Sequence, residues 1–167
     1  MDFTLSDEHK MLQESIRNFA GKELWPIAED MDEKDEWPAA IAAYKEAGVT
    51  KPREEIGMFE VHDCFSITEL LTYEDLQLSA RGKAVEDIDN GFYDLDGKIP
   101  CNPDGGLKSF GHPIGATGVR MIYEMYLQLQ GKAGKRQIEN PKLGLTHNLG
   151  GFPAYNLVSV SIVGKDL

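Results

Sequence analysis

The chain has 167 residues, of which 41% are hydrophobic and 27% charged, a composition typical of a globular domain with a core. Its net charge of −11 argues against a nucleic-acid partner, and because it contains no apolar run of about 18 residues we expect no membrane span. Cys64 and Cys101 are too few for a disulfide framework and are not spaced as zinc ligands, so no metal site is predicted. The acidic N-terminus lacks the basic and apolar regions of a signal peptide, which favours a cytoplasmic location.

Residues 6–36 predict one amphipathic helix or a broken pair of helices. Apolar residues recur there every three or four positions, which is the spacing of a single helix face. Pro26 removes a backbone donor and should kink or split the run. The stripe consists of Leu12, Ile16, Ala20, Leu24, Ile27 and Met31.

The residue pattern changes after Pro38, where helical and strand-like segments alternate. We expect helices at 38–47, at 66–78 with Ser66 as its cap, and at 115–130, with a loop-rich region at 80–113. Strands are expected at 57–63, 143–148 and 156–163. This alternation predicts an α/β layered domain. In the last helix, the predicted buried face is Val119, Ile122, Tyr126 and Leu129.

Three predicted loops carry the residues most suited to chemistry. They are 60–65, which contains His62 and Cys64, then Gly111-His112-Pro113, and finally 147–151 after a strand. Domains of the α/β class place active sites at such strand ends. Histidine moves protons readily at neutral pH, and backbone N–H groups at a helix start favour developing negative charge.

Each of these residues also has a structural interpretation. His112 could simply order a glycine–proline turn, His62 could cap a helix, and Cys64 could be a small buried residue. His147 is expected to order its loop, and Cys101 to be structural. The glycine-rich turn at 115–118 could bind a phosphate, although a tight turn alone explains it.

The first 38 residues, MDFTLSDEHKMLQESIRNFAGKELWPIAEDMDEKDEWP, resemble the extreme N-terminus of an acyl-CoA dehydrogenase. The flavin site and catalytic glutamate of that family lie far downstream, where this chain does not continue the pattern. The resemblance therefore implies an acyl-CoA dehydrogenase-like helical segment over residues 1–38, without flavin binding.

Residues 39–167 resemble the C-terminal domain of a thiolase, of the sterol-carrier-protein type. The matching segments are VHDCFSITELLTYEDL at 61–76, NPDGGLKSFGHPIGATG at 102–118 and LTHNLGG at 145–151. The resemblance implies an incomplete thiolase-like fold, with helices packed on a mixed sheet. It also implies an acyl-CoA or 3-oxoacyl-CoA thioester as substrate and no permanently bound cofactor.

The resemblance assigns roles to individual residues. It implies that His112 activates a nucleophile, Cys64 is the acid or base at the substrate α-carbon, and His62 donates to the enolate oxygen. Gly111, Pro113, Asn148, Gly150 and Gly151 are implied as substrate-binding residues.

A complete thiolase has a second, similar domain that holds the nucleophilic cysteine, and neither cysteine here lies in that context. We therefore expect a homo-oligomer or a partner chain that supplies the missing domain. The missing domain and strand should leave an apolar sheet face and an unpaired strand edge, which favour self-association. Two alternatives are a non-catalytic assembly module that associates with a full thiolase, and an acyl-CoA dehydrogenase fragment.

Overall fold

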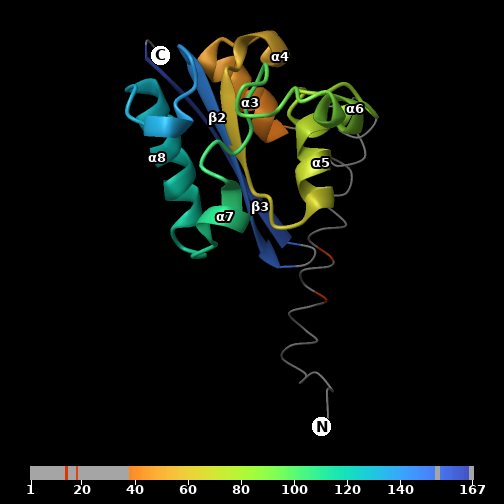
Figure 1. Cartoon of the computed structure of the whole chain (residues 1–167). Coiled ribbons are helices and arrows are strands. Elements are labelled where there is room, and N and C mark those ends of the chain that lie inside the picture. Colours follow the sequence, from red (N-terminus) through yellow and green to blue (C-terminus); the bar gives the residue numbers. More distant parts are fainter. Residues whose placement is uncertain (1–13, 15–17, 19–37, 153–154, 166–167) are drawn as a thin grey trace. The chain divides into compact units, whose positions relative to one another are not determined.

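The computed structural model describes residues 14, 18, 38–152 and 155–165, with Glu14 and Asn18 helical (Figure 1). The helical stripe predicted for residues 6–36 otherwise lies outside these described residues. The chain divides into two compact units, Met1–Pro38 and Ala39–Leu167. The second unit contains every element discussed below.

The element order of the second unit alternates helices with strands, so the predicted α/β class is confirmed. The helices are α3 (Pro38–Ala47), α4 (Pro52–Glu55), α5 (Ser66–Asp75), α6 (Ala84–Asp89), α7 (Gly106–Phe110) and α8 (Thr117–Leu129), with a 3₁₀ turn, η2, at Gly134–Arg136. The strands are β1 (Met58–Val61), β2 (Leu143–Phe152) and β3 (Tyr155–Gly164).

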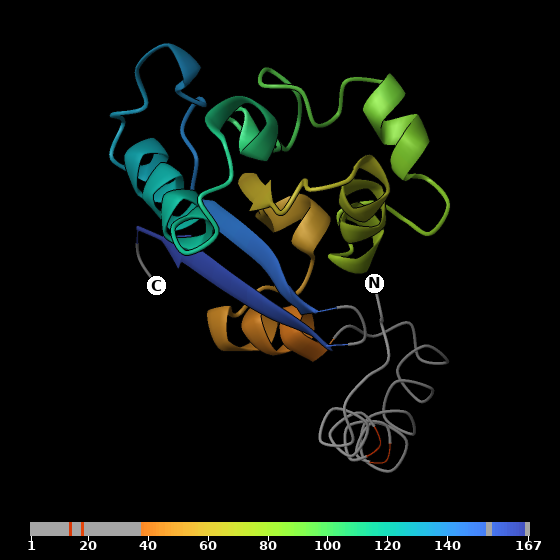
Figure 2. The ribbon, with the colours of Figure 1, turned by 90° about the horizontal axis from the view of Figure 1, so that it is seen from below.

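The three strands form one mixed sheet in the order β1-β2-β3. Strand β1 pairs with β2 in parallel, with Val61 opposite His147. Strands β2 and β3 form an antiparallel hairpin in which Leu143 lies opposite Gly164. Seen from below, α8 lies on one side of the hairpin and α3 on the other (Figure 2).

The two faces of the sheet are buried in different ways. Phe59 and Val61 of β1 join the main apolar core with residues of α3, α5 and β2, such as Tyr44, Leu76 and Leu145. The alternate residues of β1 face α8 because successive side chains of a strand point to opposite faces. There a smaller apolar cluster consists of Met58, Met125, Leu129 and Ile138, with Val163 packed against it.

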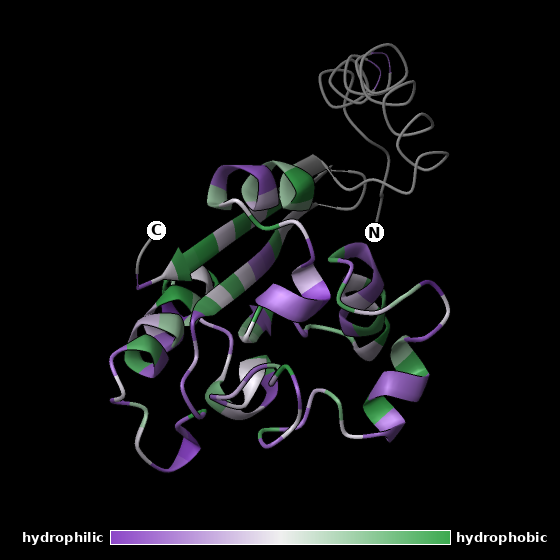
Figure 3. Ribbon diagram, turned by 90° about the horizontal axis from the view of Figure 1, so that it is seen from above, coloured by the Kyte–Doolittle hydropathy of each residue, from purple (hydrophilic) through white to green (hydrophobic). Residues whose placement is uncertain are grey.

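Helix α8 begins and ends close to the predicted bounds, but of its predicted buried face only Leu129 is buried and the other three residues are exposed. Val119 is 70% exposed, and Ile122 and Tyr126 are exposed as well. The helix instead buries a side that includes four polar residues, Thr117, Arg120, Glu124 and Gln128, together with Met121, Met125 and Leu129. Figure 3 shows how polar and hydrophobic residues alternate along the ribbon of this region.

The polar side of α8 can be buried because each of these side chains makes at least one hydrogen bond, although Arg120 Nε and Nη2 have no partner among the described residues. Glu124 accepts from Arg136 of η2 at 2.7 Å, and Gln128 donates to Glu124 and to the Arg136 carbonyl. Gln128 Oε1 also accepts the backbone N–H of Ile138 at 2.8 Å. Hydrogen bonds offset the cost of removing polar groups from water, so apolar spacing alone predicted the wrong side.

Three smaller expectations are also corrected. The predicted loop at 147–151 lies inside β2, because cross-strand pairing with β3 continues through Gly150 and Gly151. Phe65, rather than Ser66, occupies the N-cap of α5. The region 80–113, predicted as loops, contains the short helices α6 and α7.

The edge of β1 is covered by a neighbouring segment. Phe59 N–H donates to the Pro100 carbonyl at 3.0 Å, Asn102 N–H donates to the Phe59 carbonyl, and Val61 N–H donates to Asn102 Oδ1. The predicted unpaired edge is therefore not on β1, whereas β3, at the other end of the sheet, has no further strand beside it among the described residues. The exposed apolar face that we expected is found on α8 rather than on the sheet. None of the helices in the described part of the chain is long and apolar enough to cross a membrane.

Candidate active site

Two histidines from distant parts of the sequence meet at the carboxyl end of β1. His62 directly follows β1, and His112 lies between α7 and α8. Their ring centroids are 4.8 Å apart, with the ring planes at 78° in an edge-to-face arrangement. His62 is buried, whereas His112 is exposed. The structure therefore brings together two of the three residues that the sequence assigned to catalysis.

His62 is held by Asn148, a predicted substrate-binding residue on β2. The His62 Nδ1 atom lies 3.0 Å from Asn148 Oδ1, so the ring donates its Nδ1–H to this amide oxygen. Burial lowers the pKa of His62, while the Asn148 bond raises it and the nearby His112 lowers it. A neutral ring held in this way keeps Nε2 free as an acceptor. The donor role predicted from the sequence needs a hydrogen on Nε2, and therefore either a protonated ring or a rotated Asn148 amide.

His112 is held from the helix that follows it. Gly111 has φ of +100°, a conformation that favours glycine, and it turns the chain out of α7. The Pro113 carbonyl accepts the Ala116 and Thr117 N–H groups as the chain enters α8. Thr117 Oγ1 lies 2.7 Å from His112 Nδ1 and 3.3 Å from the Pro113 carbonyl. With its hydroxyl hydrogen directed to Pro113, Thr117 accepts from Nδ1–H and leaves His112 Nε2 free to take a proton.

Two further residues position the histidines and were missed from the sequence. A Cβ at Gly118 would lie 2.9 Å from Asn148 Nδ2, so glycine lets Asn148 approach the start of α8. Asp63 accepts the Leu107 N–H at 2.8 Å and fills the space beside Gly106. The loop that carries His62 is thereby tied to the segment that leads to His112. The signal in the sequence was the pair of glycines at 105–106, inside the region that we predicted to be loop-rich.

A buried ionic cluster lies beneath the histidines. Glu60, two residues before His62 on the same face of β1, bonds Arg120 Nη1 of α8 at 3.0 Å, and Arg120 Nη1 also contacts Asp104. One guanidinium therefore serves two carboxylates. Burial and, to a smaller extent, the neighbouring Asp104 together raise the pKa of Glu60 to about 9 against the opposing effect of Arg120. Glu60 is accordingly protonated at neutral pH, because a fully buried second negative charge would be costly.

Neither cysteine is in contact with the histidine pair in the described structure. Cys64 is exposed in the bend before α5. Cys101 lies on the other side of β1, where its Sγ is 3.8 Å from Glu69 Oε1. Burial raises the pKa of the Cys101 thiol well above its usual range. Cys101 is therefore a poor nucleophile, in agreement with its predicted structural role.

The remaining predicted residues lie on β2. His147 is buried on the face opposite Asn148, and burial lowers its pKa to about 4. Its Nδ1 has no hydrogen-bond partner among the described residues. Gly150 and Gly151 lie at the hairpin end of the strand, and a Cβ at Gly150 would meet nothing within 4 Å. The backbone at Gly150 is therefore open to the surroundings, and the close approach of a ligand there stays a prediction.

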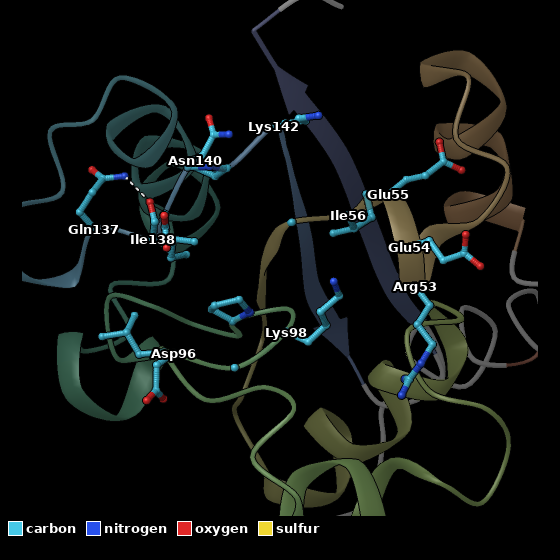
Figure 4. A pocket seen from close by; sticks show the side chains of 16 residues that line it. Arg53, Glu54, Glu55, Ile56, Asp96, Lys98, Gln137, Ile138, Asn140 and Lys142 are labelled. Carbon is cyan, nitrogen blue, oxygen red and sulfur yellow. Dashed lines mark hydrogen bonds between the residues drawn. The ribbon is translucent and has the colours of Figure 1, made fainter.

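A pocket lies at the opposite end of the sheet from the histidines. It has a volume of about 670 Å³ and is formed by residues that precede β1, such as Ile56, and residues that precede β2, such as Lys142. Figure 4 shows side chains of both signs around it, including Arg53, Glu54, Asp96 and Lys98. Because its charges are mixed and it holds none of the predicted catalytic residues, it is not the candidate site. The described residues contain no group of histidine, cysteine and carboxylate side chains arranged to hold a metal ion.

Comparison with known proteins connects this geometry to a family. Residues 28–163 match the family described as thiolase C-terminal domain-like. The chain belongs to this family. The matched region contains His62, Cys64, His112 and Asn148, and it begins before the predicted boundary at residue 38.

Several relatives support the same assignment. An acetyl-CoA acetyltransferase of Methanothermobacter thermautotrophicus is 48% identical over 113 residues, which cover 68% of this chain and 29% of that protein. Human sterol carrier protein 2 is 47% identical over 112 residues, covering 67% of this chain and 20% of its own length. The benzoylsuccinyl-CoA thiolase subunit BbsB of Thauera aromatica is 37% identical over 109 residues, which cover 65% of this chain and 28% of that protein.

A solved structure, the Ltp2-ChsH2(DUF35) aldolase, shares the fold. It superposes with a TM-score of 0.63 at 25% identity, over 77% of this chain and 31% of that one. The chain thus spans between a fifth and a third of the length of these related proteins. The resemblance of residues 1–38 to an acyl-CoA dehydrogenase receives no support from these matches and remains a prediction.

Proposed function

We propose that the chain is a thiolase-type domain that performs the acid–base part of carbon–carbon chemistry on acyl-CoA or 3-oxoacyl-CoA thioesters. The observation that carries the proposal is the His62–His112 pair, in which each ring is held through Nδ1 and each Nε2 is free for a substrate. Membership of the thiolase C-terminal family supports the same class of substrate.

In this proposal the reaction centres on the carbon next to the thioester carbonyl. Cys64, exposed and one residue beyond Asp63, removes or returns the proton at that carbon. The electron pair moves onto the thioester oxygen, which His62 stabilises when its Nε2 carries a hydrogen. His112 Nε2 takes the proton of an attacking thiol. Gly111, Pro113, Gly150 and Gly151 form the rim over which the thioester lies.

The full reaction needs a nucleophilic cysteine beside His112, and the described residues place none there. We therefore propose that a second polypeptide supplies this thiolate, either another copy of the chain or a partner with a thiolase-type domain. Coenzyme A acts here as part of the substrate rather than as a bound cofactor.

Deuterium exchange at C2 of acetyl-CoA tests the acid–base step without a nucleophile. The purified chain in D₂O should exchange these protons above the buffer rate, since a positioned base contributes about 10²–10⁴-fold. Cys64→Ala should abolish the enhancement, and Cys101→Ala is the matched control that should retain it. If the folded wild-type chain exchanges these protons no faster than buffer alone, the acid–base role is ruled out.

Thiolysis of acetoacetyl-CoA tests the complete reaction. Turnover that His112→Ala abolishes would mean that a thiolate is available to this site. Proton exchange without thiolysis would mean that the acid–base half works and that the second polypeptide is absent from the assay.

A non-catalytic assembly module is the second candidate, and the exposed apolar face of α8 favours it. This function would be supported if the chain shows no proton exchange and no thiolysis but co-purifies with a complete thiolase. The acyl-CoA dehydrogenase proposal for residues 1–38 has its own readout, because a bound flavin would absorb visible light.

A further inference from the structure

One buried arginine contacts the segments that carry both histidines of the candidate site. Arg120 of α8 is only 8% exposed, and its Nη1 atom donates to Glu60 Oε2 at 3.0 Å and to Asp104 Oδ2. The Glu60 side chain is fully buried, and that of Asp104 is 2% exposed. These three groups lie almost entirely out of water, where a charged contact holds its partners more firmly than at a surface.

On one side, Arg120 holds the strand that delivers His62. The face of β1 turned toward α8 carries Met58, Glu60 and His62 in succession, because alternate residues of a strand share a face. Met58 packs in the apolar cluster, Glu60 binds Arg120, and the strand then ends at the residue before His62. Arg120 also acts on the ring through its charge. Burial is the main cause that lowers the pKa of His62, and Arg120 lowers it as well.

On the other side, Arg120 holds the short helix that leads to His112. Asp104 accepts the first N–H of α7 at 2.9 Å through Oδ1, while its Oδ2 binds the guanidinium. At the far end of α7 the Phe110 ring lies against the same guanidinium, with 5.3 Å between Arg120 Cζ and the ring centroid. His112 follows two residues later. Thr117, which bonds the His112 ring, precedes Arg120 by one turn of α8.

The cluster is not built as a stabilising ion pair alone. One guanidinium nitrogen makes both ionic contacts, whereas Arg120 Nε and Nη2 and Glu60 Oε1 are buried without a hydrogen-bond partner among the described residues. A buried ion pair with unspent groups is often no more stabilising than apolar residues of similar volume. Its distinctive contribution is direction, because charged partners fix one another's orientation and apolar packing does not.

We propose that Arg120 is a positioning residue that sets the spacing and relative orientation of the His62 and His112 rings. It joins the end of β1 to both ends of α7, so the two rings meet only while these contacts are made. Its consequence for catalysis rests on the proposed function, whereas the arrangement of the rings can be measured on the chain without substrate.

NMR of the full chain tests this role, with the NOE between the His62 and His112 rings and the pKa of His62 as readouts. Arg120→Met should weaken the NOE and raise the pKa of His62, because a nearby positive charge is lost. Arg120→Lys should restore part of both, since it keeps the charge but not the planar guanidinium. Arg136→Met is the matched control, because Arg136 also pairs with a buried glutamate, Glu124, farther along α8 from the histidines. The control should leave both readouts at their wild-type values.

A second variant keeps the test decisive if Arg120→Met does not fold, as circular dichroism would reveal. Asp104→Asn retains the Arg120–Glu60 pair and cuts only the ionic link to α7, so it should weaken the ring NOE. The proposal would be overturned by a wild-type NOE in Asp104→Asn, by wild-type readouts in folded Arg120→Met, or by equal changes in Arg136→Met.

Deuterium exchange at C2 of acetyl-CoA measures the catalytic consequence. Arg120→Met should slow the enhanced exchange about tenfold to a hundredfold, since a displacement of about 1 Å at a site can cost about 10²-fold. Arg136→Met should retain the wild-type rate. Wild-type exchange that Arg120→Met leaves unchanged would overturn the positioning role. Exchange by the wild type at the buffer rate would instead reject the proposed function, and the ring NOE would still decide what Arg120 does.

Discussion

The two faces of the sheet differ in what fills them. On the side of α3 and α5, Phe59 and Val61 enter a continuous apolar core with edge-to-face aromatic contacts between Phe59 and the Tyr73 and Tyr93 rings. On the side of α8, the same strand presents Glu60 and His62 to a network of charged and polar groups. Apolar burial is non-directional, whereas a polar network holds its members in particular orientations. We infer that the first face supplies most of the stability and the second holds the site.

The largest expected effect is the loss of an aromatic side chain from the apolar face. Phe59 is fully buried, so Phe59→Ala should lower the free energy of unfolding by about 3–5 kcal/mol through lost burial and the cavity left behind. Urea denaturation followed by far-ultraviolet circular dichroism measures it. Exposed Phe65, at the start of α5, is the matched control, and Phe65→Ala should cost under about 1 kcal/mol. Equal losses would contradict the division between the faces.

Removal of the cation tests the polar face. Arg120→Met leaves Glu60 and Asp104 buried without their partner, which should cost about 3–4 kcal/mol at pH 8. Urea denaturation at pH 8 measures the loss.

Glu60→Gln provides the control for that experiment. The Glu60 pKa of about 9 exceeds its unfolded value, so the folded state binds an extra proton between about pH 4.5 and pH 9, and stability falls as pH rises through this window. The glutamine cannot titrate and should flatten this slope while remaining folded at pH 7. A slope equal to that of the wild type would show that Glu60 is ionised in the folded chain.

His147 gives a pH dependence of opposite sign. Its pKa of about 4 in the folded chain lies below the ordinary 6.5, so between these values the unfolded chain binds the extra proton and stability rises with pH. The full effect approaches about 3 kcal/mol and is lost as pH falls from 6.5 to 4. Comparing wild type with His147→Asn by denaturation at several pH values measures it. An unchanged slope in the variant would assign the pH dependence to other groups.

The smallest stability change is expected at the hydrogen bond that orients His62. Asn148→Ala should cost about 1 kcal/mol and lower the pKa of His62 further, since the Asn148 bond raises that pKa. Asn148→Asp should raise it, because a carboxylate stabilises the imidazolium. NMR titration of the His62 ring measures both shifts. Shifts of the same direction in the two variants would contradict the role assigned to Asn148.

Local signals predicted much of this architecture. The alanine-rich run at 38–47, the alternation at 156–163 and the Gly-His-Pro turn before a helix correspond to α3, β3 and the start of α8. The end of β2 was missed because Gly150 and Gly151 are typical of turns, whereas pairing with Leu157 and Asn156 keeps them extended. Propensity is a weak guide wherever a neighbouring strand supplies the hydrogen bonds.

The sequence by itself determined the α/β class, the family resemblance and the presence of His62, His112 and Asn148 in recognisable motifs, because these depend on residue identity and short spacing. Only the tertiary structure decided that the two histidine rings meet, that Thr117 and Asn148 hold them, and that Arg120 serves both Glu60 and Asp104. The same holds for the outward apolar side of α8. Periodicity records which residues share a helix face, but which face is buried depends on the partners that distant segments provide.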